Sequence, residues 1–422
     1  MKIIFLLFFL FLFSFYALAE AIQLTIDEAI SIGLRENKEI LLKYEDLKKA
    51  KYKLKESYSA IFPSITATGV VSKTTNLYQD KEPTQTSSQI SLKQNLYKGG
   101  KIINTIKYNQ YGLDIAQTIL DKTKLEVIFN IKKAFYTLLL TGEFVNLNKA
   151  IYKNTKRHLL VIKKRFKHGE TSSSDILKLE ESLAIVKEAY QVSINQKKVA
   201  EAVLKNFLSL EDNVDIVAKG DFVYTPKELI YEKAYLEALN NRPEIKQYSL
   251  SIEASKKLVD IAKADAKPTI YASWDYYVRS HNVSFGGLSK NWNDYSQIVL
   301  GISWPIFDGW LTKAKIEEAL IDLKEAQIAK EKLIKDIELE LKNAYLELQN
   351  AIYNLETIVS EVNKYKDILK SIRQKYKVGI ASLLDLEDAY LSYKVSLFKR
   401  KQAIYDYIIQ KAKFDKATGG AI

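Results

Sequence analysis

The segment FKHGETSSSDILKLE, residues 166–180, returns at a distance of 210 residues as YKVGIASLLDLEDAY, residues 376–390. Two shorter segments, LYKG (96–99) and IFDG (306–309), match at the same distance. Self-similarity at one long offset indicates that a supersecondary unit has been duplicated. We predict a tandem duplication, with a first repeat over residues 20–215, a linker over 216–227 and a second repeat over 228–418.

Each predicted repeat follows one plan, in which glycine and proline mark the ends of long helices. With only 15 Gly and 6 Pro in 422 residues, the chain has few turn signals, so we expect long elements between them. A first helix ends at Pro63 or Pro268, two β-rich segments follow, and a very long helix then runs to Gly169 or Gly379. For the two repeats in turn, the predicted ranges are: first helix, about 25–61 and 228–266; strands, 63–73 with 86–97 and 268–281 with 291–306; long helix, 100–167 and 310–377; closing helix, 172–209 and 382–417.

The long helices carry a heptad pattern that predicts coiled-coil packing. Apolar residues recur every seven positions, with a companion series three residues further on, and this a/d pattern indicates a seam packed against partner helices. Tyr345, Ile352 and Val359 widen the apolar stripe, which favours a helix packed between two neighbours. At 1.5 Å per residue, such a helix spans roughly 100 Å, more than a globular core requires. The seam residues are Ile131, Leu138, Val145, Tyr152, Leu159 and Phe166, and then Leu341, Leu348, Leu355, Val362, Leu369 and Tyr376.

The β-rich segments alternate apolar and polar residues instead. In the second repeat, Ile270, Ala272, Trp274, Tyr276 and Val278 alternate with Tyr271, Ser273, Asp275, Tyr277 and Arg279. This alternation is typical of a transmembrane β-strand, although a soluble hairpin with one buried face would show it too. We favour the membrane interpretation, because four strands cannot bury both of their faces alone. Tryptophan suits the membrane interface, so we expect a membrane aromatic girdle of Trp274, Trp292, Trp304 and Trp310.

The N-terminus has the pattern of a secretory signal peptide. Lys2 precedes an apolar run from Ile3 to Phe13, and Ala17-Leu18-Ala19 forms an A-x-A cleavage signature. We therefore expect residues 1–19 to be removed. The alternative is an uncleaved membrane anchor, which we disfavour because the apolar run is barely long enough to span a membrane.

Composition and motifs exclude several classes of function. The chain has no cysteine, which rules out disulfides, thiol nucleophiles and zinc–thiolate sites. Its formal net charge is +12, but the lysines are mixed with acidic residues along helices, as on an ordinary solvated face. The sequence contains no P-loop, G-x-G-x-x-G, H-E-x-x-H or nucleophile elbow. We predict that the protein is not an enzyme and has no cofactor, no metal site and no nucleic-acid partner.

The signal peptide, the duplicated halves, the order helix–strand–strand–helix–helix and the paired turn motifs resemble the outer-membrane efflux protein family of TolC-like channels. The resemblance runs from Leu24 to Thr418. It implies a mainly α fold with a membrane β-barrel, in which a homotrimer forms an α-helical barrel and each subunit gives four strands to a shared barrel of twelve. The linker at 216–227 would lie in the family's equatorial region.

The resemblance also implies a function and a set of partners. The protein would be the exit duct of a tripartite efflux or type I secretion system in the outer membrane of a Gram-negative-type bacterium, with its helical barrel in the periplasm. It would be gated at its periplasmic helix tips. Its partners would be a periplasmic adaptor (membrane fusion) protein, an inner-membrane RND or ABC transporter, and outer-membrane lipid.

The second tip segment resembles the part of the family that closes the periplasmic entrance. By position, Asp385 and Asp388 match acidic residues that ring the entrance, and Tyr376 matches a tyrosine of the same network. Three copies of these carboxylates around one axis would favour cations. Carboxylates in the first turns of a helix also serve as ordinary capping groups, and that role remains open. Ala381 departs from the family pattern, which has a helix-linking arginine there.

The two tip turns resemble the loops that dock adaptors in this family. Ser and Thr at these positions are also good helix N-caps, so a purely structural role remains open as well. The expected docking residues are His168, Gly169, Thr171, Val378, Gly379 and Ser382.

Two other functions remain as hypotheses. A soluble periplasmic coiled-coil adaptor or scaffold would lack aromatic alternating strands. An exported hydrolase or other enzyme would need a compact site, whereas the three histidines, His158, His168 and His281, are far apart in the chain.

Overall fold

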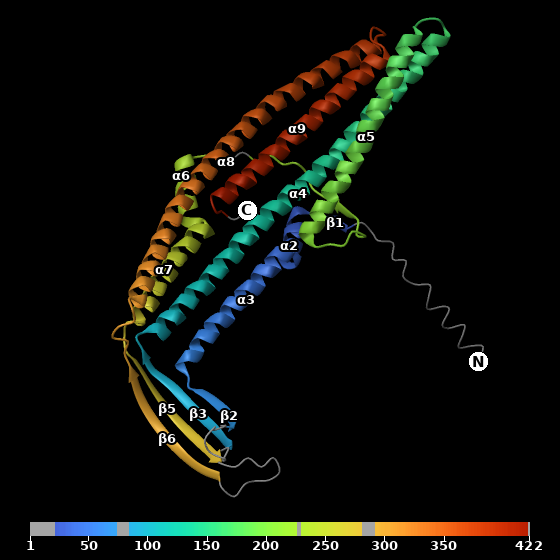
Figure 1. Cartoon of the computed structure of the whole chain (residues 1–422). Coiled ribbons are helices and arrows are strands. Elements are labelled where there is room, and N and C mark those ends of the chain that lie inside the picture. The colour runs from blue at the N-terminus through green and yellow to red at the C-terminus, as the bar shows by residue number, and fades with distance from the viewer. Residues whose placement is uncertain (1–21, 74–83, 226–228, 281–291, 421–422) are drawn as a thin grey trace, which may run out of the picture. The chain divides into compact units, whose positions relative to one another are not determined.

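The computed structural model describes residues 22–73, 84–225, 229–280 and 292–420 (Figure 1). The chain forms two compact units, and each takes segments from both predicted repeats. The first unit, which we call the tip unit, contains Met1–Leu42, Asp121–Arg242 and Lys335–Ile422. The second, the sheet unit, contains Lys43–Leu120 and Pro243–Ile334. The predicted signal peptide, residues 1–19, lies outside the described residues.

The long and closing helices are confirmed to within a residue or so. The long helices α4 (Lys101–Lys167) and α8 (Leu311–Lys377) each have 67 residues, and both their starts and their ends are 210 residues apart. The closing helices are α5 (Ser173–Leu208) and α9 (Leu383–Ala417). The heptad pattern and the sparse Gly and Pro thus sufficed to place these four elements.

The prediction of one continuous first helix in each repeat is wrong. The first repeat has α2 (Ile26–Glu36) and α3 (Lys38–Tyr58), followed by a short 3-10 turn at Ser59–Ile61; the second has α6 (Tyr231–Asn241) and α7 (Pro243–Ala264).

The two breaks have different causes. Asn37 has an extended backbone, and its Oδ1 accepts a hydrogen bond from the Glu39 amide at 3.0 Å, so it caps α3. Its Nδ2 donates to the carbonyl of Phe207 at 2.9 Å. In the second repeat, Pro243 pushes Arg242 out of the helical region and begins the new helix.

The predicted linker contains a strand that was not predicted. Strand β4 (Ile216–Ala218) pairs in parallel with β1 (Ile22–Leu24). Both strands have three residues, too few to show an alternating pattern. The pairing ties the start of the first repeat to the segment that follows it.

The heptad seam forms the core of the tip unit. Ile131 and Leu341 are fully buried there, whereas Phe166 and Tyr376, at the last seam positions, are 44% and 41% exposed. Helix α4 packs between two neighbours: Tyr152 stacks on Tyr190 of α5, and Phe144 packs on Phe398 of α9 at a centroid distance of 5.3 Å. On α8, where the broad apolar stripe was predicted, Tyr345 contacts both Tyr231 of α6 and Phe414 of α9, whereas Val359 is 39% exposed. Figure 1 shows these helices running side by side.

The sheet unit is built around four antiparallel strands. The strands are β2 (Ser64–Lys73), β3 (Thr84–Lys98), β5 (Thr269–Ser280) and β6 (Trp292–Ser303), in the order β2-β3-β5-β6 (Figure 1). All four correspond to predicted strands, with ends shifted by up to three residues. The central pair, β3 and β5, joins the two repeats.

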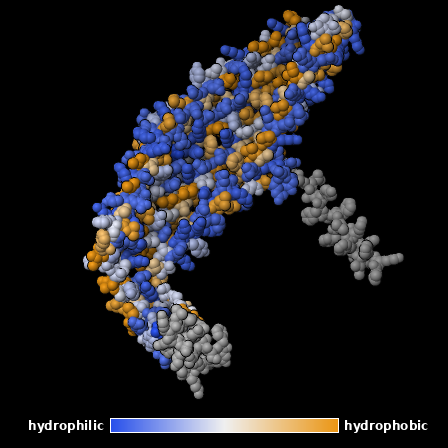
Figure 2. Space-filling view, viewed as in Figure 1, coloured by the Kyte–Doolittle hydropathy of each residue, from blue (hydrophilic) through white to orange (hydrophobic). Residues whose placement is uncertain are grey.

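The two faces of this sheet differ in polarity, as the alternation predicted. On β6, Ile298, Leu300 and Ile302 are 82%, 73% and 71% exposed. Their register partners on β5 are Trp274, Ala272 and Ile270, so the apolar residues of both strands share one face. Figure 2 also shows hydrophobic residues at the turn that leads from β6 into α8. Within the described part of the chain, no helix is both long and apolar enough to cross a membrane.

Candidate gate at the helix tips

The two tip turns end the long helices through glycine. Gly169 and Gly379 have φ angles of 75° and 78°, in the left-handed region that glycine adopts at little cost. The amide of Glu170 donates to the carbonyl of Arg165 at 3.0 Å, and that of Ile380 donates to Lys375 at 2.9 Å. These bonds satisfy carbonyls in the last turn of each helix. The predicted docking glycines therefore have a clear role in shaping the turns.

The helices that follow begin with identical capping boxes. Ser172 Oγ accepts a hydrogen bond from the Asp175 amide at 3.2 Å, and the Asp175 carboxylate accepts from the Ser172 amide at 3.1 Å. At the second tip, Ser382 and Asp385 make the same two bonds at 3.1 and 2.8 Å. Each box satisfies two amides that the first helical turn leaves without a partner.

Asp385 is therefore engaged in capping α9. Hydrogen bonds from the Ser382 hydroxyl and amide lower the pKa of the Asp385 carboxyl below its ordinary value. The same two bonds from Ser172 lower the pKa of Asp175. The capping role considered for Asp385 is thus observed; a role in a pore would be additional to it.

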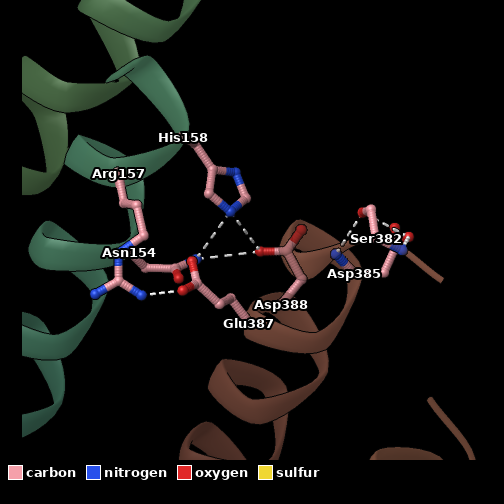
Figure 3. A network of polar contacts seen from close by, with 7 residues as sticks. All are labelled: Asn154, Arg157, His158, Ser382, Asp385, Glu387 and Asp388. Atoms are coloured by element: carbon pink, nitrogen blue, oxygen red, sulfur yellow. Dashed lines mark hydrogen bonds and ion pairs between the residues drawn. The ribbon is translucent and has the colours of Figure 1, made fainter. Parts of the chain in front are cut away.

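Asp388 belongs to a polar network between α4 and α9 (Figure 3). Its Oδ1 accepts a hydrogen bond from Asn154 Nδ2 at 3.1 Å and lies 3.3 Å from His158 Nε2. The His158 side chain is 19% exposed, and that of Asp388 is 57% exposed. The carboxylate predicted to ring a pore is thus held against α4 of its own chain.

An ion pair one residue earlier reinforces the network. The Arg157 guanidinium pairs with the Glu387 carboxylate, whose side chain is only 14% exposed (Figure 3). The other carboxylate oxygen, Oε2, is buried without a hydrogen-bond partner among the described residues. Because Glu387 is largely covered, loss of Arg157 would leave a poorly solvated charge. We call Asn154, Arg157, His158, Glu387 and Asp388 the α4–α9 clamp.

The clamp gathers only one of the three predicted gate residues. Tyr376 lies in the last turn of α8, where its carbonyl accepts a hydrogen bond from the Gly379 amide at 3.1 Å. Neither Tyr376 nor Asp385 is a member of the clamp, although Asp385 lies beside it in Figure 3. The other four clamp residues were not predicted as functional. Only the antiparallel register of α4 and α9 brings them together, and no local motif shows that register.

The predicted docking residues divide into exposed and structural ones. Val378 and its neighbour Ile380 are 70% and 76% exposed, so the second tip presents apolar side chains. His168 is exposed as well. Ser382 caps a helix, and the Thr171 hydroxyl is buried without a hydrogen-bond partner among the described residues. Docking by these residues stays a prediction.

The tryptophans predicted for a membrane girdle are exposed wherever their side chains are described. Trp274, Trp304 and Trp310 are 42%, 63% and 68% exposed; the Trp292 side chain lies outside the described residues. Trp310 has a φ of 66°, which is costly for a residue with a side chain. In the first repeat, this position is taken by Gly100, with a φ of 87°.

The fold and the tips define a class: a membrane protein that combines antiparallel coiled coils with a four-stranded sheet bearing one exposed apolar face. Comparison with known proteins gives the family. The sequence pattern of the family described as "Outer membrane efflux protein" matches residues 30–208 and again 234–420. The chain belongs to this family of TolC-like outer-membrane efflux channels, which are trimeric and are not enzymes. Membership places it in the outer membrane of a Gram-negative bacterium.

Similar proteins include a nodulation protein and two channels of known structure. Nodulation protein T of Rhizobium leguminosarum bv. trifolii is 22% identical over 313 residues, which are 73% of this chain and 66% of that protein. The CmeC outer-membrane channel of Campylobacter jejuni is 18% identical, with a TM-score of 0.78 over 94% of this chain and 85% of that one. The MtrE outer-membrane channel of Neisseria gonorrhoeae is 17% identical, with a TM-score of 0.77 over 94% and 89%. These two likenesses establish the fold.

Proposed function

We propose that this chain forms the outer-membrane exit duct of a tripartite efflux or type I secretion system. The observation that carries the proposal is the sheet, with one exposed apolar face and one polar face. Ile298, Leu300 and Ile302 expose most of their surface, whereas Asp275, on the other face, is 8% exposed and accepts hydrogen bonds from Gln89 and Ser273. A soluble coiled-coil adaptor is not expected to expose a row of apolar residues on a strand to water. Hydrocarbon covers such a face without cost.

The edges of the sheet support assembly with further copies of the chain. Among the described residues, β2 and β6 are the outer strands of the sheet, and each bonds to a neighbouring strand on one side only. An unpaired strand edge cannot face lipid, because its amides and carbonyls would lack partners. Three chains of four strands each close into a barrel of twelve strands without an edge. The trimer of the family supplies this number of strands.

We assign the α4–α9 clamp to the closed state of the tips. Its contacts join α4 to α9 through Arg157 with Glu387 and through Asn154 and His158 with Asp388. The family pattern has a linking arginine where this chain has Ala381, and the clamp offers linking groups from α4 instead. Opening the entrance would require α9 to move relative to α4, and this would break the clamp.

The exposed tip residues and the lack of a nucleotide-binding motif in the sequence support two partners, an adaptor and a transporter. Val378 and Ile380 offer an exposed apolar surface for a periplasmic adaptor, with His168 on the other tip turn. The chain contains no nucleotide-binding motif. The energy for export would therefore come from an inner-membrane transporter of the RND or ABC class.

Reconstitution into planar lipid bilayers tests the proposal. Protein extracted from outer membranes with detergent should give discrete conductance steps, and Asp388→Ala should raise the conductance by loosening the clamp. A protein that inserts but never conducts, in either form, would contradict the exit-duct function.

A further inference from the structure

The polar face of the four-stranded sheet carries an excess of basic side chains. Strand register places Lys93, Lys98 and Arg279 on the same face as Asp275, because their partners across the strands are Ser273, Thr269 and Ser87. This face therefore carries three basic residues and one acidic residue among the described strand residues. Asp294, the other acidic residue on the described strands, lies on the other face of the sheet, because its register partner is Val278.

Two of the three cations are held by aromatic rings. Lys93 Nζ lies 4.7 Å from the centroid of the Tyr271 ring. The Arg279 guanidinium lies 5.3 and 5.4 Å from the ring centroids of Tyr277 and Tyr295. Those two rings stack on each other with centroids 4.9 Å apart, so they form one platform beneath the guanidinium.

Contacts with aromatic rings keep the charge that an ion pair would cancel. A ring face attracts a cation through its quadrupole and adds no negative charge of its own. The acidic residue of this face, Asp275, accepts hydrogen bonds from Gln89 and Ser273 at 3.0 and 2.9 Å. It also attracts Lys93, which offsets part of the charge of that lysine. Arg279 is exposed, so its positive charge acts on the solution in front of this face.

We propose that Arg279, held by Tyr277 and Tyr295, and Lys93, held by Tyr271, form a cationic filter that favours anions over cations on the polar face of the sheet. This proposal rests on the proposed function, in which the polar face lines the water-filled duct. Three subunits would bring three copies of each cation around one axis. Such a concentration of like charge attracts counter-ions and repels ions of its own sign. The solutes favoured at this level are anionic, and anions with an aromatic group could also stack beside the tyrosines.

The test is the reversal potential across a planar bilayer that separates two KCl concentrations. Arg279→Gln should shift it towards the potassium equilibrium potential, with roughly a threefold rise in the permeability ratio of potassium to chloride. Arg279→Lys keeps the charge and should leave the ratio near that of the wild type. Asp294→Asn, on the other face of the sheet, is the matched control and should change it little.

A single cysteine makes the test independent of folding. The chain has no native cysteine, so Arg279→Cys offers one target for each subunit. A positively charged methanethiosulfonate reagent, the ethyltrimethylammonium form, should return the permeability ratio to near the wild-type value in channels already conducting in the membrane. The ethylsulfonate form, which is negative, should shift the ratio further towards potassium.

The possible outcomes test the cationic filter and the exit-duct function separately. Channels that conduct but show the same reversal potential for the wild type, Arg279→Gln and both modified cysteine forms would overturn the filter and leave the exit-duct function standing. A wild-type protein that forms no channel at all would overturn both.

Discussion

Asp388 Oδ1 lies 3.3 Å from His158 Nε2, so the second turn of α9 is joined to α4 within one chain. Asn154 Nδ2 donates to the same oxygen at 3.1 Å. A carboxylate that only lined a pore would need no such partners. Asp388 therefore contributes both a negative charge and a contact with α4, and different substitutions remove one or the other.

The contact is tested by Asp388→Ala against Asp388→Asn. Alanine removes the acceptor for Asn154 and His158, whereas asparagine keeps a carbonyl oxygen that can accept from either side chain. We expect Asp388→Ala to open the tips and increase the conductance several-fold, and Asp388→Asn to have a smaller effect. Equal conductance of the two variants would show that the contact does not hold the tips closed.

The charge is tested through block by multivalent cations. The double variant Asp385→Asn with Asp388→Asn removes two carboxylates from each chain and keeps side chains that can accept hydrogen bonds. If these groups face the duct, the concentration of a trivalent lanthanide that halves the current should rise at least tenfold in planar bilayers. Unchanged block would place both carboxylates away from the ion path.

The capping boxes predict that the tips lose stability in acid. The pKa of Asp175 and of Asp385 is lowered in the folded chain by hydrogen bonds from Ser172 and Ser382. A carboxyl whose pKa is lower folded than unfolded stabilises the fold above its unfolded pKa. That stabilisation is lost as the pH falls through the folded pKa, which lies below the usual value near 4. Amide exchange at the starts of α5 and α9, corrected for its intrinsic pH dependence, should therefore accelerate in this range.

Ser382→Ala provides the control for this pH dependence. Loss of an N-cap serine costs about 1 kcal/mol of helix stability. It also removes the hydroxyl that holds the Asp385 carboxylate. The start of α9 should then exchange faster at neutral pH and respond less to acid, while α5 keeps its response. An acid response at α9 equal to the wild type's would rule out the capping box as its source.

The left-handed backbone of Trp310 predicts an unusual order of stabilities. Trp310→Gly and Trp310→Ala both remove the contact between Trp310 and Phe307, whose ring centroids are 5.2 Å apart. Only glycine adopts a φ of 66° without strain. We expect the glycine variant to be more stable than the alanine variant by about 1 kcal/mol, seen as a higher melting temperature. The reverse order would mean that the backbone at 310 changes its conformation freely.

The sequence predicts the elements whose signals repeat over many residues. The heptads that contain Ile131 and Leu341 placed α4 and α8, and alternation around Trp274 placed β5 and its polar and apolar faces. The heptads reflect burial of one side of a helix, and the alternation reflects the different surroundings of the two faces of a strand. In both cases the same surroundings act on every residue of one side. Each pattern can therefore be recognised even where individual residues depart from it.

The parts that were not predicted depend on single contacts between distant segments. The break at Asn37 relies on a side chain that bonds to its own helix start and to Phe207, 170 residues away. The clamp relies on the register that sets His158 opposite Asp388. The sequence around one position in a helix does not reveal which residue faces that position on another helix. Asp175, in contrast, could have been predicted as the counterpart of Asp385, since the two are 210 residues apart.

The number of chains in the protein extracted from outer membranes tests the account most directly. Native mass spectrometry in detergent should show a complex of three copies, because three sheets of four strands are needed to close the barrel around a duct. A mature protein that remains a soluble monomer in detergent-free buffer, and is absent from the outer-membrane fraction, would contradict the account.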